Sequence, residues 1–299
     1  DNGILNIVAR PAPVDAGLSK PYTSSRIITK DKGDWKYGRI EVKAKSPKGQ
    51  GTFAAAWLLP TNSVYGGWPL SGEIDLAEWV NIDVERADGD VDHHVHGTLH
   101  YGPLSGNSHD YTGTSYSLPG GSPANDFHVY AIEWEEGEIR WYVDDVLFAF
   151  QRDSELTYRA VDGAAAGLSE TGWYTQIINE EDEKQLVYQH APYDQSFFLI
   201  LNNAVGGDWA SNSHQSSQYI KGDSKGSLAN GVDPLAYANG NALQVDYVRV
   251  YQCAKDLATG KGCATISSDY YNNTYVTGAA PVPIPPVIPV PVGVDIFAD

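Results

Sequence analysis

The sequence has no methionine and only 2 cysteines, and its basic residues are few. The 20 Lys and Arg are outnumbered by 38 Asp and Glu, which gives a formal net charge of −18. Nucleic acids and anionic membranes would repel such a chain, so we expect neither as a partner and favour a neutral substrate. The sequence also has no apolar run that approaches the ~18 residues of a membrane-spanning helix.

The missing methionine and the scarce cysteines bear on how the protein is processed. Because the chain starts at Asp1 without Met, we expect that an upstream segment has been removed, and we predict a secreted, extracellular monomer. Cys253 and Cys263 would close a short loop if they pair, but two cysteines do not make a disulfide scaffold. The sequence leaves open whether they form a disulfide.

Aromatic residues, in contrast, are plentiful, with 8 Trp, 19 Tyr and 7 Phe. Aromatic rings pack well on pleated sheets, which favours an all-β protein. Flat rings also suit a carbohydrate-binding protein, because sugar rings stack on them, although additional core aromatics would explain a share of them.

The hydrophobic pattern has a period of two and shows no long stretch with helical spacing. In residues 38–45, Ile40, Val42 and Ala44 alternate with charged residues, as in a half-buried strand. The predicted strands are 38–45, 129–134, 139–143, 146–150, 197–201 and 243–251. Short strands separated by Gly, Asn, Asp and Pro predict a β-sandwich.

Two segments depart from this alternation. Residues 151–190 are polar and mixed, and residues 203–240 are rich in Gly, Ser and Asn. We expect both to be long loops, which in compact domains are usually functional or mobile. Short helical turns are predicted at 153–159 and 180–184.

The end of the chain differs in kind. Residues 279–292 read AAPVPIPPVIPVPV, which predicts a semi-rigid polyproline spacer. We therefore expect a main domain over 1–252, an extension over 253–278 that contains both cysteines, and a linker over 279–299 toward a further module that was removed.

The run EIDLAE at 73–78 places three carboxylates close together. On a strand, Glu73 and Asp75 face the same side, but Glu78 lies at an odd offset and would face the other. A β-bulge near 76–77 would add one residue and turn all three carboxylates to one face, with the apolar residues between them toward the core.

Grouped carboxylates suit glycoside hydrolysis with retention of configuration. Retaining enzymes need two carboxyl groups roughly 5–5.5 Å apart, one as nucleophile and the other as acid and then base. A third acid helps to separate the two pKa values, so that one group is ionised while the other keeps its proton. The acids alone leave a second interpretation open, a solvated acidic edge strand, although Trp57, Trp68, Trp79 and several glycines lie nearby.

The stretch YGGWPLSGEIDLAEW at 65–79 resembles the signature of family-16 glycoside hydrolases, and in particular of the bacterial laminarinase-like endo-β-1,3-glucanases. Six further blocks occur in the order of that family. They are YTSSRI (22–27), YGRIEVKAKSPKGQGTFAAAWLLP (37–60), HGTLHYG (96–102), FHVYAIEW (127–134), FFLILNNAVGG (197–207) and VDYVRVYQ (245–252). The resemblance covers residues 1–252, which would then be the catalytic domain.

This resemblance implies a jelly-roll β-sandwich of two antiparallel sheets, of which the concave sheet carries the substrate cleft. It also implies that Glu73 is the nucleophile, Glu78 the acid/base and Asp75 a helper between them. The two residues between Asp75 and Glu78 match the bulged branch of the family, which includes laminarinases, agarases and carrageenases. Ala77 stands where the family commonly has Met.

Roles for further side chains follow from the same resemblance. Trp57 and Trp68 match tryptophans that form a platform for the sugar. Arg26 matches an arginine that reaches the sugar on the donor side, and His100 matches a histidine of the cleft. For each of these four, a purely structural role is the alternative. Asn202 matches a recurrent family asparagine, for which a structural role is expected.

The resemblance also bears on metal binding. Many members bind a structural calcium, and the matching positions are the Gly3 carbonyl and Asp246 on the final strand; no cofactor is expected for catalysis.

The chain departs from the family in two places. The N-terminal strand that supplies a further calcium ligand and sugar contacts is missing before Asp1, which would leave an exposed sheet edge. Asn203 stands where the family has an apolar residue.

The sequence therefore predicts a retaining endo-β-1,3-glucanase that binds and hydrolyses laminarin-like glucans. A non-catalytic β-1,3-glucan recognition protein is one alternative, but such proteins have lost one or both catalytic glutamates, and both are present here. A hydrolase of agar or carrageenan is another. Sulfated carrageenan would require extra Arg or Lys in the cleft, and few basic residues flank these motifs.

Overall fold

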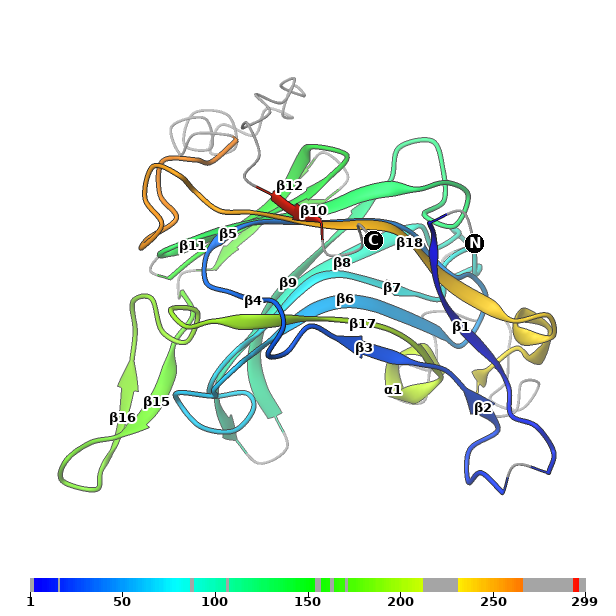
Figure 1. Ribbon diagram of the computed structural model, residues 1–299, viewed down its shortest axis with the longest axis horizontal. Coiled ribbons are helices and arrows are strands. Elements are labelled where there is room, and N and C mark those ends of the chain that lie inside the picture. Colours follow the sequence, from blue (N-terminus) through cyan, green and yellow to red (C-terminus); the bar gives the residue numbers. More distant parts are fainter. Residues whose placement is uncertain are drawn as a thin grey trace.

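The structure is a computed structural model that describes residues 3–15, 17–86, 89–105, 108–153, 157–161, 164–169, 172–211, 231–265 and 293–295. Within these residues, two large antiparallel sheets form the two layers of a sandwich (Figure 1). This is the jelly-roll β-sandwich that the resemblance implied. No helix in the described ranges is long and apolar enough to cross a membrane.

The larger sheet has ten strands among the described residues. In spatial order they are β14 (Ala164–Ser169), β13 (Thr157–Val161), β12 (Val146–Arg152), β11 (Glu138–Val143), β10 (His128–Glu135), β5 (Gly38–Lys45), β18 (Asn241–Tyr251), β1 (Leu5–Pro11) and β2 (Tyr22–Thr23), with β19 (Gly293–Asp295) paired to β18. The predicted strands at 38–45, 129–134, 139–143, 146–150 and 243–251 all belong to this sheet and are confirmed.

The smaller sheet has seven strands in the described part of the chain. In order they are β3 (Arg26–Ile28), β17 (Phe197–Val205), β6 (Thr52–Pro60), β7 (Glu73–Val80), β8 (His94–Ser105) and β9 (Ser108–Ser117), with β4 (Asp34–Trp35) also paired to β17. The carboxylate run forms β7, a central strand between β6 and β8 (Figure 1). The edge strand β3 leaves Ile27 38% and Ile28 48% exposed.

The inner faces of the two sheets form one hydrophobic core. On β5, Ile40, Val42 and Ala44 are each 0% exposed, as the alternation predicts. From β7, Ile74 and Leu76 enter the same cluster from the other sheet. Each fully buried aliphatic side chain of this kind contributes about 1.5–3 kcal/mol relative to an exposed one. The core therefore fixes which face of β7 is left for polar groups.

The prediction of a long loop at 151–190 is wrong. Strands β13 and β14 lie at one edge of the larger sheet, and β15 (Thr175–Ile178) pairs with β16 (Lys184–Val187) as a separate hairpin. The helical turn predicted at 153–159 is also wrong, because β13 begins within it. The turn predicted at 180–184 is the connection between β15 and β16, and its last residue, Lys184, already belongs to β16. Strands with a face open to solvent need no run of apolar residues, so the polar composition was a poor guide.

The segment 203–240 is only partly a loop. Its first residues belong to β17, and it also contains the short helix α1 (Gly207–Ala210) and the 3₁₀ helix η2 (Pro234–Tyr237). Asn203 is 1% exposed, and its Nδ2 donates to the carbonyls of Ile7 at 3.0 Å and Asn241 at 2.9 Å. This side chain joins the two sheets, which explains a polar residue at an otherwise apolar position.

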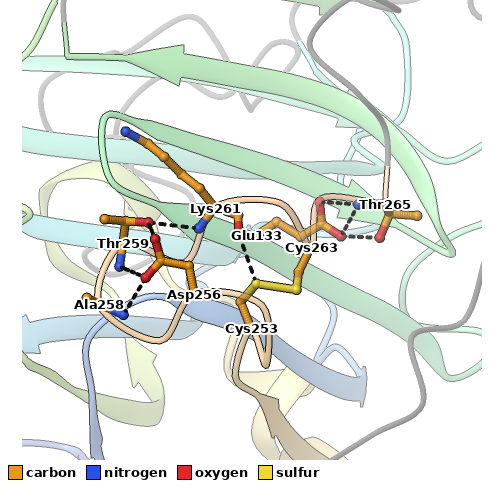
Figure 2. The surroundings of a disulfide bond; sticks show 8 residues. All are labelled: Glu133, Cys253, Asp256, Ala258, Thr259, Lys261, Cys263 and Thr265. Carbon is orange, nitrogen blue, oxygen red and sulfur yellow. Dashed lines mark hydrogen bonds between the residues drawn. A yellow bond between two sulfur atoms is a disulfide. The ribbon is translucent and has the colours of Figure 1, made fainter.

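The two cysteines form a disulfide that closes a loop after β18 (Figure 2). Figure 2 also shows Thr265, just beyond this loop, donating from its backbone nitrogen and its hydroxyl to the carboxylate of Glu133. Glu133 belongs to β10 and is 5% exposed, so the loop covers part of the outer face of the larger sheet. The predicted spacer at 279–292 lies outside the described residues.

Candidate active site

A β-bulge interrupts β7 where the sequence predicted one. Trp57 of β6 pairs with Asp75, and Ala56 pairs with Ala77, so Leu76 has no partner on β6. On the other side, the β7–β8 register also shifts between Asp75 and Glu78. The bulge adds one residue to β7 and resets the alternation of its side chains.

The bulge brings the three carboxylates to the outer face of the smaller sheet. Leu76 and Ala77 are consecutive, yet both enter the core, at 2% and 0% exposed. Glu78 is thereby returned to the side of Asp75, and the charges of Asp75 and Glu73 both act on it. The three acidic side chains therefore lie on one face of the sheet, as the sequence predicted.

A tryptophan from the opposite sheet holds the bulge. The Nε1 of Trp141, on β11, donates to the backbone carbonyl of Asp75 at 2.9 Å. Gly97 of β8 leaves room for this indole, since a Cβ at that position would lie 2.5 Å from Trp141 Cδ1. Neither residue was singled out from the sequence. The one available signal was a glycine within a strand, which often marks a close approach.

Glu73 receives several interactions that favour its ionised form. Trp68 donates from Nε1 to Glu73 Oε2 at 2.6 Å. Burial raises the pKa of Glu73, but His100, the Trp68 bond, a hydrogen bond with Asp75 and the charge of Arg26 all oppose that increase. Of the three carboxyls, Glu73 is therefore the one whose negative charge its neighbours stabilise most.

The loop that carries Trp68 is anchored rather than free. The hydroxyl of Tyr65 donates to Asp194 at 2.8 Å, and Gln195 Nε2 donates to the carbonyl of Ser71 at 3.2 Å. Trp68 itself remains 47% exposed. A fixed, exposed indole beside a carboxylate can both bind a flat ring and hold the carboxylate in place.

His100 lies on β8 opposite Glu73. Its Nε2 is 3.1 Å from Asp75 Oδ2, and its Nδ1 is 2.7 Å from Nε2 of His109 on β9. The buried hydroxyl of Tyr193 donates to the His100 carbonyl at 2.9 Å and lies 3.3 Å from the Glu73 carbonyl. Neither Tyr193 nor His109 was predicted from the sequence, because no local motif links either residue to the carboxylates.

Glu78 has fewer stabilising partners. Its side chain is buried, and among the described residues it accepts a hydrogen bond from Thr98 Oγ1 at 3.4 Å. Burial, and then the negative charges of Asp75 and Glu73, raise the pKa of Glu78 well above its usual range. Burial and the Glu73 charge also raise the pKa of Asp75 well above its usual range. The site therefore contains one carboxyl whose anion is better supported and two carboxyls whose pKa values are raised well above the usual range.

The family model for glycosyl hydrolases family 16 matches residues 8–166, which include β7 and its bulge. The chain is a family-16 glycosyl hydrolase. It is 37% identical over 255 residues to a beta-glucanase of Rhodothermus marinus, an alignment that covers 84% of this chain and 68% of that protein.

Other members of family 16 align over the same extent of the chain. A glucan endo-1,3-beta-glucosidase A1 of Niallia circulans is 36% identical over 259 residues, which cover 84% of this chain but only 30% of that protein. The solved structure of the laminarinase from Rhodothermus marinus superimposes with a TM-score of 0.56 at 36% identity, over 84% of this chain and 78% of that one.

Two more residues that the family-16 resemblance had marked lie together on the smaller sheet. Arg26 of β3 places its Cζ 5.0 Å from the ring centroid of Trp57 on β6. The Nε1 of Trp57 donates to Asn202 Oδ1 at 2.6 Å, which gives Asn202 the structural role expected for it. The guanidinium and the amide together orient the indole, whose partner in the register is Asp75.

The resemblance implied calcium ligands at Gly3 and Asp246, and the second of these has a different partner in the structure. The Asp246 carboxylate is paired with Lys43, whose Nζ is 2.7 Å away, so a cation already neutralises it. Gly3 offers a carbonyl but no charge. Within the described residues, ligand atoms of Glu73, Asp75 and His100 lie within 4.8 Å of one another, but these side chains interact with each other in the carboxylate site. A calcium at Gly3 and Asp246 remains a prediction that these contacts disfavour.

Proposed function

We propose that this chain is a retaining endo-1,3-β-glucanase that hydrolyses laminarin-like glucans by double displacement. The observation that carries the proposal is the bulged strand β7, which presents Glu73, Asp75 and Glu78 on one face with unequal support for their charges. The glucanase and laminarinase relatives support the substrate class.

The mechanism assigns different tasks to the two glutamates. Glu73, ionised, attacks the anomeric carbon while Glu78, protonated, gives its proton to the leaving oxygen. The resulting glycosyl-enzyme ester is hydrolysed by a water molecule that the now ionised Glu78 deprotonates, and the configuration is retained. Asp75 keeps a proton between them and donates to Glu73, which fits the elevated pKa of Asp75.

The surrounding aromatic and basic side chains suit a neutral glucan. We assign Trp57 and Trp68 as sugar platforms, Arg26 as a donor-side contact and His100 as a contact near the reacting sugar. The net charge of −18 disfavours a sulfated galactan, because a polyanion would be repelled. A non-catalytic glucan-binding role is disfavoured, because both glutamates are present and differ in the way the chemistry requires.

The first test combines a product analysis with one variant. Wild-type protein should cleave laminarin in preference to agarose and carrageenan, and NMR of the first products should show the β-anomer. Glu73→Ser should lower hydrolysis by roughly 10⁴-fold or more while laminarin binding persists, because only the nucleophile is removed. Initial release of the α-anomer, or a Glu73→Ser variant with the wild-type rate, would contradict the proposal.

A further inference from the structure

His109 extends the carboxylate group toward the edge of the sheet. It lies on β9, two residues before Tyr111, the register partner of His100. Its Nε2 is 2.7 Å from His100 Nδ1, and the other nitrogen of His100 is 3.1 Å from Asp75 Oδ2. Three ionisable groups therefore lie in a row from a buried strand to an edge strand, and the double displacement described above gives no role to His109 at the end of this row.

The two contacts of the His100 ring differ in quality. Asp75 Oδ2 is within ion-pair distance of His100 Nε2, yet among the described residues this oxygen has no hydrogen bond of acceptable geometry. A small rotation of the imidazole would therefore break the contact with Asp75. The bond to His109 is short for two nitrogens and is the one hydrogen bond recorded for the His100 ring in the described part of the chain. His109 is thus what fixes the orientation of His100.

The protonation of the two imidazoles determines when this bond exists. With both rings neutral, one donates and the other accepts. With one proton added, a His100 imidazolium can donate from Nδ1 to His109 while its Nε2 hydrogen faces Asp75. With both rings charged, neither nitrogen can accept, so the bond is lost and the two cations repel each other.

Other groups around His109 act on this equilibrium. Trp68 packs against its ring with centroids 4.5 Å apart and carries no charge. Asp110 and Tyr111 are its neighbours on β9, and the Tyr174 hydroxyl donates to Asp110. Burial and the charge of His100 lower the pKa of His109, and Asp110 opposes this. Burial likewise lowers the pKa of His100, and the Glu73 charge opposes it.

We propose that His109 is a positioning residue of the reaction: its hydrogen bond holds His100 against Asp75 and stabilises the His100 cation that keeps Glu73 ionised. The inference rests on the proposed function, since it concerns the same carboxylates. It adds a residue of the edge strand β9 to the machinery and predicts that His109 acts on the acidic side of the pH profile.

Two substitutions distinguish the effect of the His109 hydrogen bond from the effect of its aromatic ring. His109→Phe keeps a ring for Trp68 to pack against but offers no partner to His100. Without that acceptor, the His100 cation loses its proton at lower pH, and Glu73 loses a positive neighbour. The acid limb of kcat/KM should then move to higher pH by about half a unit, with the alkaline limb unchanged. His109→Gln places an amide at similar reach, so the wild-type acid limb should be restored.

NMR titration of the imidazole rings gives a second readout that needs no substrate. The His100 midpoint should fall in His109→Phe and return in His109→Gln. His128→Phe is the matched control, because His128 lies on the other sheet and bonds to Asp144; it should leave the pH profile and His100 unchanged.

An unmoved acid limb and His100 midpoint in His109→Phe would overturn the inference, and so would an equal loss of rate at every pH. A wild type that cleaves no β-glucan would instead refute the proposed function, and the NMR titration would still decide the role of His109.

Discussion

Glu73 and Glu78 are the same kind of residue on the same strand, yet the two ends of β7 surround them differently. Burial raises the pKa of both. At the Glu73 end, Trp68, His100, Asp75 and Arg26 all support the anion. At the Glu78 end, Thr98 is the one supporting donor among the described residues, and the neighbouring acids oppose ionisation. The donors placed beside each carboxyl, and not burial as such, therefore separate the proposed acid from the proposed nucleophile.

The comparison also depends on backbone geometry. In a regular strand, residues 73 and 78 would lie on opposite faces of the sheet, so the two glutamates could not act on the same sugar. The bulge at Leu76 removes that obstacle, and Trp141 fixes the bulge from the far side of the core. The asymmetry between the glutamates therefore rests on a contact between the two sheets.

The largest expected effect is that the activity lost on replacing each glutamate depends differently on the leaving group of the substrate. Glu73→Gln should lower kcat by roughly 10⁴-fold or more on both laminarin and a dinitrophenyl β-glycoside, because each needs the nucleophile. Glu78→Gln should lower kcat/KM by roughly 10²–10⁴-fold on laminarin but little on the aryl glycoside, whose leaving group needs no proton in the first step. The kcat on the aryl glycoside should still fall, because the second step has lost its base. Steady-state kinetics on both substrates measures this. The reverse pattern would exchange the two assignments.

A second, smaller effect concerns the bulge. Gly97→Ala would place a Cβ 2.5 Å from Trp141 Cδ1, so the indole must shift and weaken its bond to the Asp75 carbonyl. We expect unfolding free energy to fall by about 1–3 kcal/mol, as for other overpacked cores, and kcat to fall with it. Denaturant unfolding and kinetics check this. Gly121→Ala is the control, because a Cβ there meets nothing within 4 Å. Equal stability of the two variants would show that Trp141 is not tightly held.

The sequence predicted those parts of the fold that have a local pattern. Strands such as β5 alternate with a period of two, and the odd offset between Glu73 and Glu78 was enough to require a bulge. Strands β13 to β16 were missed because they are short and their sequences do not alternate regularly between apolar and polar residues. Most side chains of the β15–β16 hairpin are at least partly exposed, so no apolar face was needed there.

The candidate site shows the same division. Trp68 and His100 belong to blocks near the carboxylates in the family resemblance, and the structure places both beside Glu73. Trp141, Tyr193 and His109 reach the site from distant parts of the chain, through contacts that only the packing of two sheets creates. No spacing rule connects them to β7, so their roles could be recognised only in three dimensions.

The smallest effects should fall on opposite limbs of the pH profile, and they test the comparison most directly. Trp68→Phe keeps the ring but removes the donor to Glu73, so the pKa of Glu73 rises and the acid limb moves to higher pH by roughly half a unit. Thr98→Val removes the donor to Glu78, whose pKa rises further; the alkaline limb then moves to higher pH by only a few tenths of a unit, because that bond is long. The measurement is kcat/KM against pH, and each variant serves as the control for the limb that it should not move. If both variants shifted the same limb, the two ends of β7 would not act independently, and the assignment of one glutamate to each limb would have to be abandoned.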